Sequence, residues 1–567
     1  MGYGIAQPQN VIFWGAGATA ALGIHTTDGQ TQFIRRITGA DAPDDEPLEK
    51  RVAEALHPSD KEPWHSALLD LITILGDTDD AYDSIRSTDD KQLDAMRRNW
   101  REGACEDELH RRIIGLRLIY DWPALKSVVR ICPGSATAKF KLNDLFNLLD
   151  MHIPAGFGVR APACQGLSGG EKQYEEQFFD ARRLIGAKNA LLMILIALFY
   201  IDYQVCISSN GNLDKYHEFA IHLGRRMQRQ GLDLSSQHGL DRLDQPKFYQ
   251  GDVGFVSLNY DPIALWVQFI ANRELSESAD VPHIGSPAVP LHLFHDFGHL
   301  IPARRISKGP ADWPWYPLNE GATQRLNELN TGADCRVRLT KFLFPHGCLC
   351  WRECPNCGKL SAYHGDQWDL HSHSLFPPPP LRAFDTGVCP DWISGMERAQ
   401  REKGLIDARL CLHCGTLTYA HHTQVVMQSS FKSRPPSFIE EIQRDLRATT
   451  MQANHIILMG YSLPQDDVTY RAFFSASRQR HKGSSDQQVR CTVVGKEPDH
   501  PGWYGPTELK TPKFPEDHAV SAAVDIFGND NVRFYGGGVP EVFLDSGGRP
   551  TDATLERLLT WSSTVVT

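Results

Sequence analysis

Residues 11–27, which read VIFWGAGATAALGIHTT, constrain the fold of this chain more than any other stretch. An apolar run leads directly into Gly15-Ala16-Gly17, and small residues follow. This pattern predicts a buried β-strand, a tight glycine turn and the start of a helix. Gly15 permits the turn, Gly17 lets backbone N–H groups approach a phosphate, and Ala20 is small enough for close helix–strand packing. Because a helix N-terminus attracts the charge of a pyrophosphate, the stretch predicts a dinucleotide site, with an ordinary packing turn as the alternative.

The acidic residue that usually binds the ribose of a dinucleotide stands about 20 positions after such a turn. Here the nearby acids are Asp41, Asp44 and Asp45, which fall in a loop rich in Pro and Asp. The pattern therefore departs from the plain fingerprint of a dehydrogenase.

Composition bounds the class of protein. A chain of 567 residues predicts about two to four domains. The net charge of -11 argues against a general affinity for nucleic acid. The most apolar run, residues 190–201, is too short to span a bilayer and predicts a buried helix. With no signal peptide visible and two C-x-x-C pairs among 13 cysteines, we expect a cytoplasmic protein whose cysteines bind metal.

Periodicity divides the chain into a sheet-forming framework with two interruptions. Residues 1–38 begin a Rossmann-like NAD-binding domain, and helical patterning then dominates residues 39–250. Strand signals return in residues 251–305, a Cys/His/Pro-rich zinc module occupies 306–436, and residues 437–567 complete the domain. The predicted fold class is therefore α/β, a Rossmann-like doubly wound parallel sheet interrupted by a large helical insertion and a Cys₄ zinc module.

Individual elements follow from apolar spacing. Helices are expected over residues 51–56, 64–75, 90–100, 106–120, 142–149, 174–203, 216–230, 437–453, 468–480 and 552–562. Further strands are expected at residues 254–260, 290–294, 455–460 and 489–495, and loops at 41–47 and 156–172.

Two C-x-x-C knuckles, Cys354–Cys357 and Cys411–Cys414, are each followed by a glycine. A knuckle supplies two thiolates from one tight turn, and structural zinc needs four such ligands in a tetrahedron. Two knuckles therefore predict a closed structural Zn²⁺ site formed by Cys354, Cys357, Cys411 and Cys414. Four unrelated reduced cysteines are the alternative, and replacement ligands are available from Cys348, Cys350 and Cys389.

Two other segments place polar side chains at expected strand ends, where open α/β sheets bind ligands. In the first, Asn259 is expected to face a ligand, while Asp261 caps the helix that begins near Pro262. The second, residues 291–299, contains three histidines, of which His292 and His295 are the candidates for a site. For both His292 and His295, the alternative is a histidine without a functional role, either on the surface or hydrogen-bonded in the core.

Taken in their order along the chain, these motifs resemble the sirtuin superfamily. That family has a Gly-Ala-Gly turn followed by Gly-Ile-Pro, then Thr-Gln-Asn-Ile-Asp, a catalytic His before Gly, a Cys₄ zinc module and a Gly-Thr-Ser-Leu-like turn. The matching segments here are Gly15-Ala16-Gly17 with Gly23-Ile24, Asn259 with Asp261, His295 or His292, the four cysteines, and Gly460-Tyr461-Ser462-Leu463. They span residues 11–500, apart from the helical insertion.

Departures from the pattern of the protein deacylases indicate which branch of the sirtuin superfamily this chain resembles. Where a deacylase carries Pro-Asp-Phe-Arg, this chain has His25-Thr-Thr-Asp28, and residues 425–432 replace the peptide-pairing Phe-Gly-Glu stretch. The spellings Asn-Tyr-Asp and Gly-Tyr-Ser-Leu-Pro-Gln-Asp-Asp are more similar to the sirtuin-like NAD hydrolases of bacterial anti-phage defence. A Cys₄ module is less usual in that group, so an NAD-dependent protein deacylase stays an alternative, as does a catalytically silent NAD- or ADP-ribose-binding sensor.

The resemblance implies cleavage of the nicotinamide–ribose bond of NAD⁺ by an effector that depletes cellular NAD. Asn259 would orient the ribose and the attacking water, His295 would accept a proton, and Asp261 would stand beside them. The pyrophosphate would be bound by Gly15, Ala16, Gly17 and Thr19, and the adenosine side by Gly460 and Ser462. Such effectors act as oligomers or with a partner such as a HerA-type ATPase or a short Argonaute, and the helical insertion is the natural docking surface.

Overall fold

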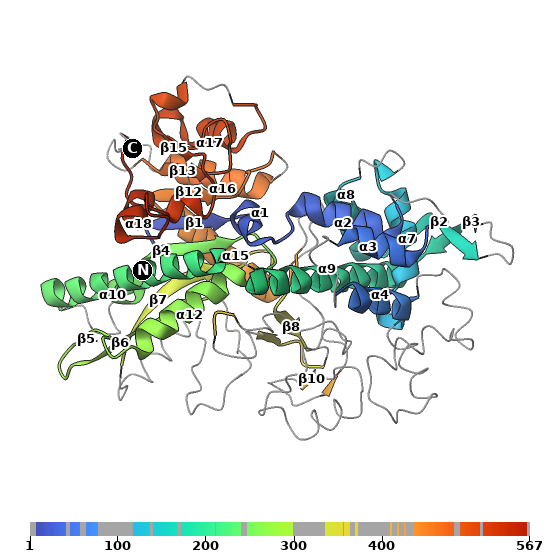
Figure 1. The fold of residues 1–567 in the computed structure, drawn as a ribbon, viewed down its shortest axis with the longest axis horizontal. Helices are drawn as coiled ribbons and strands as arrows, with labels where there is room; N and C mark the ends of the chain where they lie inside the picture. The colour runs from blue at the N-terminus through green and yellow to red at the C-terminus, as the bar shows by residue number, and fades with distance from the viewer. Residues whose placement is uncertain are drawn as a thin grey trace.

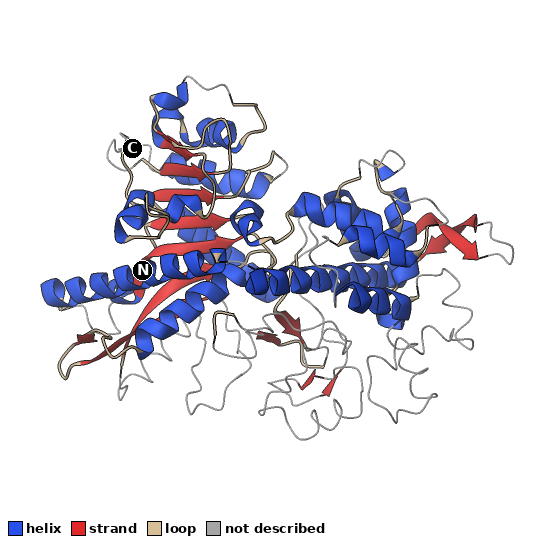
Figure 2. Ribbon diagram, in the orientation of Figure 1, coloured by secondary structure: helices blue, strands red, loops and turns tan. Residues whose placement is uncertain are grey.

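The computed structural model describes residues 7–40, 46–56, 64–76, 117–135, 140–166, 172–209, 211–239, 246–298, 335–354, 356–362, 369–371, 409–410, 417–418, 425–426, 435–465, 467–480, 488–510 and 514–563. These residues form a layered α/β part, which holds a twisted sheet, and a helical body beside it (Figures 1 and 2). The chain is thus α/β, with an architecture compatible with a Rossmann-like fold.

The main sheet has nine strands among the described residues, in the order β14-β15-β13-β12-β1-β4-β7-β6-β5. Neighbouring strands from β15 to β6 pair in parallel, and the two edge strands, β14 and β5, are antiparallel. The strands are β1 (Asn10–Trp14), β4 (Gln250–Ser257), β5 (His283–Ile284), β6 (Val289–Asp296), β7 (Arg336–Leu343), β12 (His455–Met459), β13 (Arg490–Val494), β14 (Trp503–Tyr504) and β15 (Val532–Tyr535).

Helices cover both faces of this sheet, which explains why its central strands β1 and β12 are nearly continuous apolar runs. Trp14 of β1 contacts Tyr216 on one face, and Phe13 contacts Tyr470 and Phe474 on the other. The first face carries α10 (Asn212–His238), α12 (Ile263–Glu277) and α18 (Asp552–Leu559). The second face carries α15 (Ser437–Gln452), α16 (Val468–Arg480) and α17 (Ala519–Phe527).

The segment between β1 and β4 forms the helical body. It contains α2 (Thr27–Thr38), α3 (Leu48–Ala55), α4 (Trp64–Leu75), α7 (Trp122–Ile131), α8 (Leu142–Ala155), a hairpin of β2 (Val159–Gly166) and β3 (Lys172–Phe179), and α9 (Ala181–Ser209). The short helix α11 (Pro246–Tyr249), from the same segment, packs against β4 and β7 of the sheet. The helices α9 and α10 run between this body and the sheet (Figure 1). By length and composition α9 could cross a membrane, yet 89% of its most apolar window is buried within the protein. The prediction of a buried helix at residues 190–201 is confirmed.

Most predicted elements are observed within a few residues of their expected bounds, and α16 is observed at its expected bounds. The expected loop at 156–172 and the first part of the helix at 174–203 are wrong, because β2 and β3 pair there as a hairpin. The strand β7 falls within the range 306–436 of the zinc module, yet it lies in the main sheet between β4 and β6. The helix expected at 90–100 lies outside the described residues, as does most of that at 106–120.

Candidate functional site

The topology selects one edge of the sheet as the place for a site. From β1 the chain continues to β4 on one side, and it later returns to β12 on the other side. Trp14, the last residue of β1, is in register with Ser257 and with Met459, so the three strands end at the same level. In open α/β sheets, ligands bind outside the carboxyl ends of the strands at such a reversal of strand order.

Two glycine-containing turns meet at this edge. The N–H of Gly15 donates to the carbonyl of Met459 at 2.9 Å, and the N–H of Gly17 donates to the carbonyl of Gly460 at 2.9 Å. A Cβ on Gly460 would lie 2.1 Å from the backbone nitrogen of Ala18, and Gly460 has a φ of +61°. A Cβ on Gly15 would lie 2.6 Å from the Gly460 carbonyl oxygen. Glycine is therefore required because the two backbones pack directly against each other.

The helix after the first turn is short. It comprises α1 (Ala16–Thr19) and one 3₁₀ turn, η1 (Ala20–Leu22), and Gly23 ends it with a φ of +84°. The predicted packing role of Ala20 is wrong, because Ala20 is exposed and the fully buried Ala18 takes that position. The short helix then gives way to residues 24–26, which lead into α2.

Asn259 joins the glycine turn to the end of β4. Its Nδ2 donates to the carbonyl of Gly15 at 3.2 Å and to Oγ1 of Thr19 at 3.1 Å. Thr19 in turn donates to the carbonyl of Ala16 at 3.3 Å. The structure thus brings together four of the residues predicted from sequence, and it leaves Asn259 half-buried at the strand end.

Asp261, two residues after Asn259, is buried. Its Oδ1 accepts the N–H of Ile263 at 3.1 Å in an Asx-type turn, and the N-cap residue of α12 is Pro262 in place of the predicted Asp261. Burial raises the pKa of Asp261 to about 6, and hydrogen bonds from the backbone and from Asn259 oppose that rise. The charge of Asp202, on α9, makes a smaller contribution that also raises the pKa of Asp261.

His295 does not lie at this edge. The next residue, Asp296, pairs with Lys341 of β7, and Lys341 pairs with Gly254 of β4. Gly254 pairs with Val11, three residues before the end of β1. His295 is thus four residues short of the carboxyl edge, or about 13 Å at a rise of about 3.3 Å per residue.

The surroundings of both candidate histidines are those of a packed sheet. His295 is buried, its Nε2 lies 3.4 Å from Nδ2 of Asn272 on α12, and its ring stacks on Phe297. His292 is half-buried on the opposite face of β6, where burial lowers its pKa. The structure brings neither histidine to Asn259.

A different histidine, His346, lies at the edge. It stands three residues beyond the end of β7, and Tyr470 of α16 contacts its Nε2 through the phenol oxygen at 3.0 Å. The ring of Tyr260, next to Asn259, is 6.4 Å from the His346 ring. The backbone N–H of Leu349 donates to the Tyr260 carbonyl at 2.8 Å, so the segments after β4 and β7 are in contact. The sequence signal for His346 is the apolar run 342–344 that precedes it, which was not among the predicted strands.

The second turn continues past Gly460. The N–H of Gly460 donates to the carbonyl of Val494 at 2.8 Å, which links β12 to β13. Ser462 is exposed, and Leu463 adopts a φ of 51°, a conformation that residues with a side chain rarely adopt. The hydroxyl of Tyr461 donates to Asp467 and closes the turn. Gly460 therefore lies against the glycine turn and Ser462 follows it, and their role in binding the adenosine side stays a prediction.

This edge can bind and orient a polar ligand. It offers the amide of Asn259 and the exposed hydroxyl of Ser462, whereas the N–H groups of Gly15 and Gly17 already donate to the second turn. No family model and no curated protein matches this chain. The chemistry of the edge is therefore argued from its own geometry.

The first C-x-x-C pair has the geometry of a metal-binding knuckle. The N–H of Gly358, with a φ of +67°, donates to the carbonyl of Cys354 at 2.8 Å, and Cys354 N–H donates to the Lys359 carbonyl at 3.0 Å. Cys354 is buried and Cys357 is partly exposed. The strands β8 (Trp351–Glu353) and β9 (Leu360–Ala362) flank this turn as a hairpin. A tight turn with two thiolates fits half of a zinc site.

The second pair, Cys411 and Cys414, lies outside the described residues, as does Cys389. The short antiparallel strands β10 (Arg409–Leu410) and β11 (Leu417–Thr418) precede and follow the second pair in sequence, just as β8 and β9 precede and follow the first pair. Within the described part of the chain, no three His, Cys, Asp or Glu side chains gather as a metal site.

Proposed function

We propose that this chain is an NAD⁺ hydrolase that cleaves the nicotinamide–ribose bond. The observation that carries the proposal is the position of Asn259, whose amide joins Gly15 and Thr19 where the strand order reverses. An amide at this point is suited to orient ribose hydroxyls and a water molecule beside a bound dinucleotide. The resemblance to the sirtuin superfamily supports the same assignment.

We assign the proton acceptor to His346 in place of His295. In the sirtuin pattern the catalytic histidine precedes a glycine, and His346 precedes Gly347 at the carboxyl end of β7. His295 lies four residues short of the edge, too far back to reach a ligand there. The contact between Tyr470 and Nε2 fixes the orientation of the His346 ring.

The reaction consumes one water molecule. The C–N bond between the ribose and nicotinamide breaks, nicotinamide leaves with the bonding electron pair, and water oxygen bonds to the ribose carbon. The products are nicotinamide, ADP-ribose and one proton, which His346 accepts from the water. The turn formed by Gly15, Ala16, Gly17 and Thr19 would hold the pyrophosphate, and Gly460 with Ser462 would hold the adenosine side.

Zinc would have a structural role in this protein. Cys354 and Cys357 would provide two ligands, and Cys411 and Cys414 the other two, in a closed tetrahedron without an open position. The ion would fix the module that follows β7, and it would supply no step of the reaction.

At the cellular level, the proposal is an effector that depletes NAD⁺ in bacterial anti-phage defence. The helical body would be the surface for self-assembly, or for a separately encoded partner such as a HerA-type ATPase or a short Argonaute. This part of the proposal rests on the resemblance alone.

The experiment is nicotinamide release from NAD⁺ by the purified chain, in the absence of a peptide. We expect Asn259→Ala to lower the rate by about 10²-fold or more, as removal of a positioned polar group in catalysis does. Asn454→Ala is the matched control, because Asn454 is an exposed asparagine at the start of β12, away from the carboxyl edge, where its Nδ2 donates to Oε1 of Gln9. It should keep the wild-type rate.

Other outcomes separate the alternatives. Turnover that appears only with an acyl-lysine peptide would identify a deacylase. Binding of NAD⁺ without turnover in either condition would identify a sensor. Wild-type rates in Asn259→Ala would refute the assignment of the site.

A further inference from the structure

We propose that His25, held by Asp202, is a second imidazole of the candidate site and contacts the bound dinucleotide. The inference rests on the proposed function and extends its site to a residue of the helical body. His25 follows the glycine turn closely in sequence: Thr19 contacts Asn259, η1 ends at Gly23, and His25 stands two residues later. The side chain keeps 25% of its surface exposed.

Two hydrogen bonds to one carboxylate fix His25. Its backbone N–H donates to Oδ2 of Asp202 at 2.9 Å, and its Nδ1 lies 2.7 Å from Oδ1 of the same side chain. The Asp202 side chain is only 2% exposed, because it projects from the buried helix α9. A carboxylate that accepts the Nδ1–H of a histidine orients the ring and leaves Nε2 as the atom for proton chemistry or ligand contact.

Asp202 connects this imidazole to the rest of the site. The next residue of α9, Tyr203, donates from its hydroxyl to the Leu370 carbonyl at 3.5 Å, and Trp266 of α12 donates to the same carbonyl at 3.3 Å. This part of α9 therefore meets the first turn of the helix that follows Asn259. The segment before His25 is also held from the helical body, because Asn212 Nδ2 donates to the Ala21 carbonyl at 3.1 Å. His25 therefore belongs to a segment that is held between the glycine turn, which contacts Asn259, and the helices α9 and α10.

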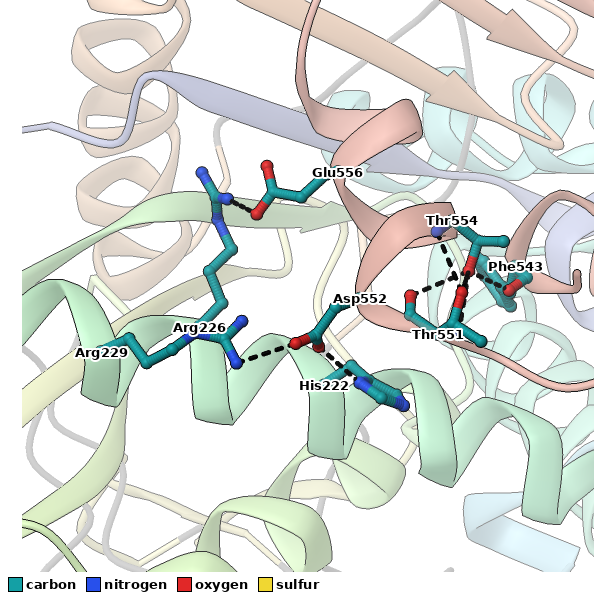
Figure 3. Close-up of polar contacts among 8 residues, drawn as sticks. All are labelled: His222, Arg226, Arg229, Phe543, Thr551, Asp552, Thr554 and Glu556. Carbon is teal, nitrogen blue, oxygen red and sulfur yellow. Dashed lines mark hydrogen bonds and ion pairs between the residues drawn. The ribbon is translucent and has the colours of Figure 1, made fainter.

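A His–Asp pair can also be purely structural, and the chain offers such a pair for comparison. On α10, Nδ1 of His222 lies 2.6 Å from Oδ1 of Asp552, and the His222 side chain is 22% exposed. Figure 3 shows how Arg229 shares Asp552 and how Arg226 pairs with Glu556, so that the cluster joins α10 to α18. The two pairs match in the atoms joined, in distance and in the exposure of the imidazole, whereas Asp552 is 49% exposed and Asp202 only 2%. Only the first pair follows the glycine turn in sequence.

The kinetic test compares variants of the two pairs by nicotinamide release between pH 5 and pH 9. We expect His25→Gln and Asp202→Asn each to lower kcat by about tenfold or more, within the range of a positioned acid–base group. Asp202→Asn should also displace a limb of the pH profile, since it changes the group that faces Nδ1. A structural role alone would lower thermal stability and leave the pH profile in place. His222→Gln should retain both the rate and the profile.

A second measurement does not depend on turnover. Diethyl pyrocarbonate modifies exposed imidazoles, and peptide mass spectrometry reports the extent at His25 and at His222. The probe is a carbocyclic NAD⁺ analogue that cannot be hydrolysed at the nicotinamide bond, with its binding monitored by thermal shift. We expect saturating analogue to protect His25 at least fivefold and to leave His222 unprotected.

The outcomes distinguish the two proposals. Binding of the analogue with equal modification of His25 in its presence and absence would overturn this inference alone. A wild-type kcat and pH profile in His25→Gln, with Asn259→Ala inactive, would do the same. Failure of the wild-type protein to bind the analogue would overturn both the proposed function and this inference.

Discussion

Replacement of Gly460 by alanine tests whether the two turns at the carboxyl edge pack as described. Gly460 has a φ of +61°, a conformation that costs a residue with a Cβ about 1–2 kcal/mol. The added Cβ would also lie 2.1 Å from the Ala18 backbone nitrogen and 2.4 Å from the Gly17 carbonyl carbon. Because both neighbours are backbone atoms, the overlap requires a backbone shift and costs about 1–3 kcal/mol more. We expect the free energy of unfolding to fall by about 2–5 kcal/mol in total.

Gly548→Ala separates the two contributions. Gly548 has a φ of +76°, and a Cβ there would meet nothing within 4 Å, so only the conformational cost of about 1–2 kcal/mol applies. Thermal unfolding and nicotinamide release would be measured for both variants. We expect Gly460→Ala to melt several degrees below Gly548→Ala and to lose NAD⁺ turnover, while Gly548→Ala keeps it. Equal melting temperatures for the two variants would refute the close approach of the turns.

Two further predictions concern the buried acid and the metal. Because the folded pKa of Asp261 is raised to about 6 from an ordinary value of 3.8, the folded state binds more protons than the unfolded state between these values, and stability falls as pH rises through this window. Asp261→Asn should remove that fall, so that above pH 6 its free energy of unfolding exceeds that of the wild type by up to about 3 kcal/mol. Denaturant titrations from pH 4 to pH 8 measure this difference, and an unchanged pH dependence would contradict the burial of the charge. Cys354→Ser should lower zinc from about one ion per chain to near zero in elemental analysis, with Cys335→Ser as the control that keeps it. Full zinc occupancy in Cys354→Ser would exclude this cysteine as a ligand.

The central strands could be predicted from sequence because both faces of the sheet are covered. After one polar residue each, strands β1 and β12 are continuous apolar runs, and such runs are the signal of a buried parallel sheet. The glycine turn and Asn259 could be predicted for a related reason. Both depend on local residue types at strand ends, and the topology rule for open sheets brings those ends together.

The strand β7 could not be recognised because it contains buried cations. Arg338 donates from Nη1 to the Phe248 carbonyl at 2.5 Å, and Lys341 lies 3.0 Å from Asp296 and 2.5 Å from Asp445. Each charge is compensated by a group far away in sequence, so the local pattern is that of a charged surface segment. Without β7, the position of His346 at a strand end could not be inferred.

The assignment of His295 depended on register, which the sequence does not encode locally. Alternation along β6 does place Leu291, Leu293 and His295 on one buried face. It gives no information on how far β6 extends relative to β1, because that offset is set by pairing through β7 and β4. The prediction at β2–β3 was wrong for a different reason. Residues 172–177, KQYEEQ, favour a helix by their composition, but they form a strand because they pair with β2.

The helical insertion is part of the candidate site and not a separate module. Three of its side chains hold the segment that follows the glycine turn: the Tyr216 hydroxyl donates to the Ala18 carbonyl, Asn212 contacts Ala21, and Asp202 holds His25. These contacts come from α9 and α10, the helices that run from the body to the sheet. A displacement of the body relative to the sheet must therefore break these bonds or move the turn, so the geometry around Asn259 depends on where the insertion is held.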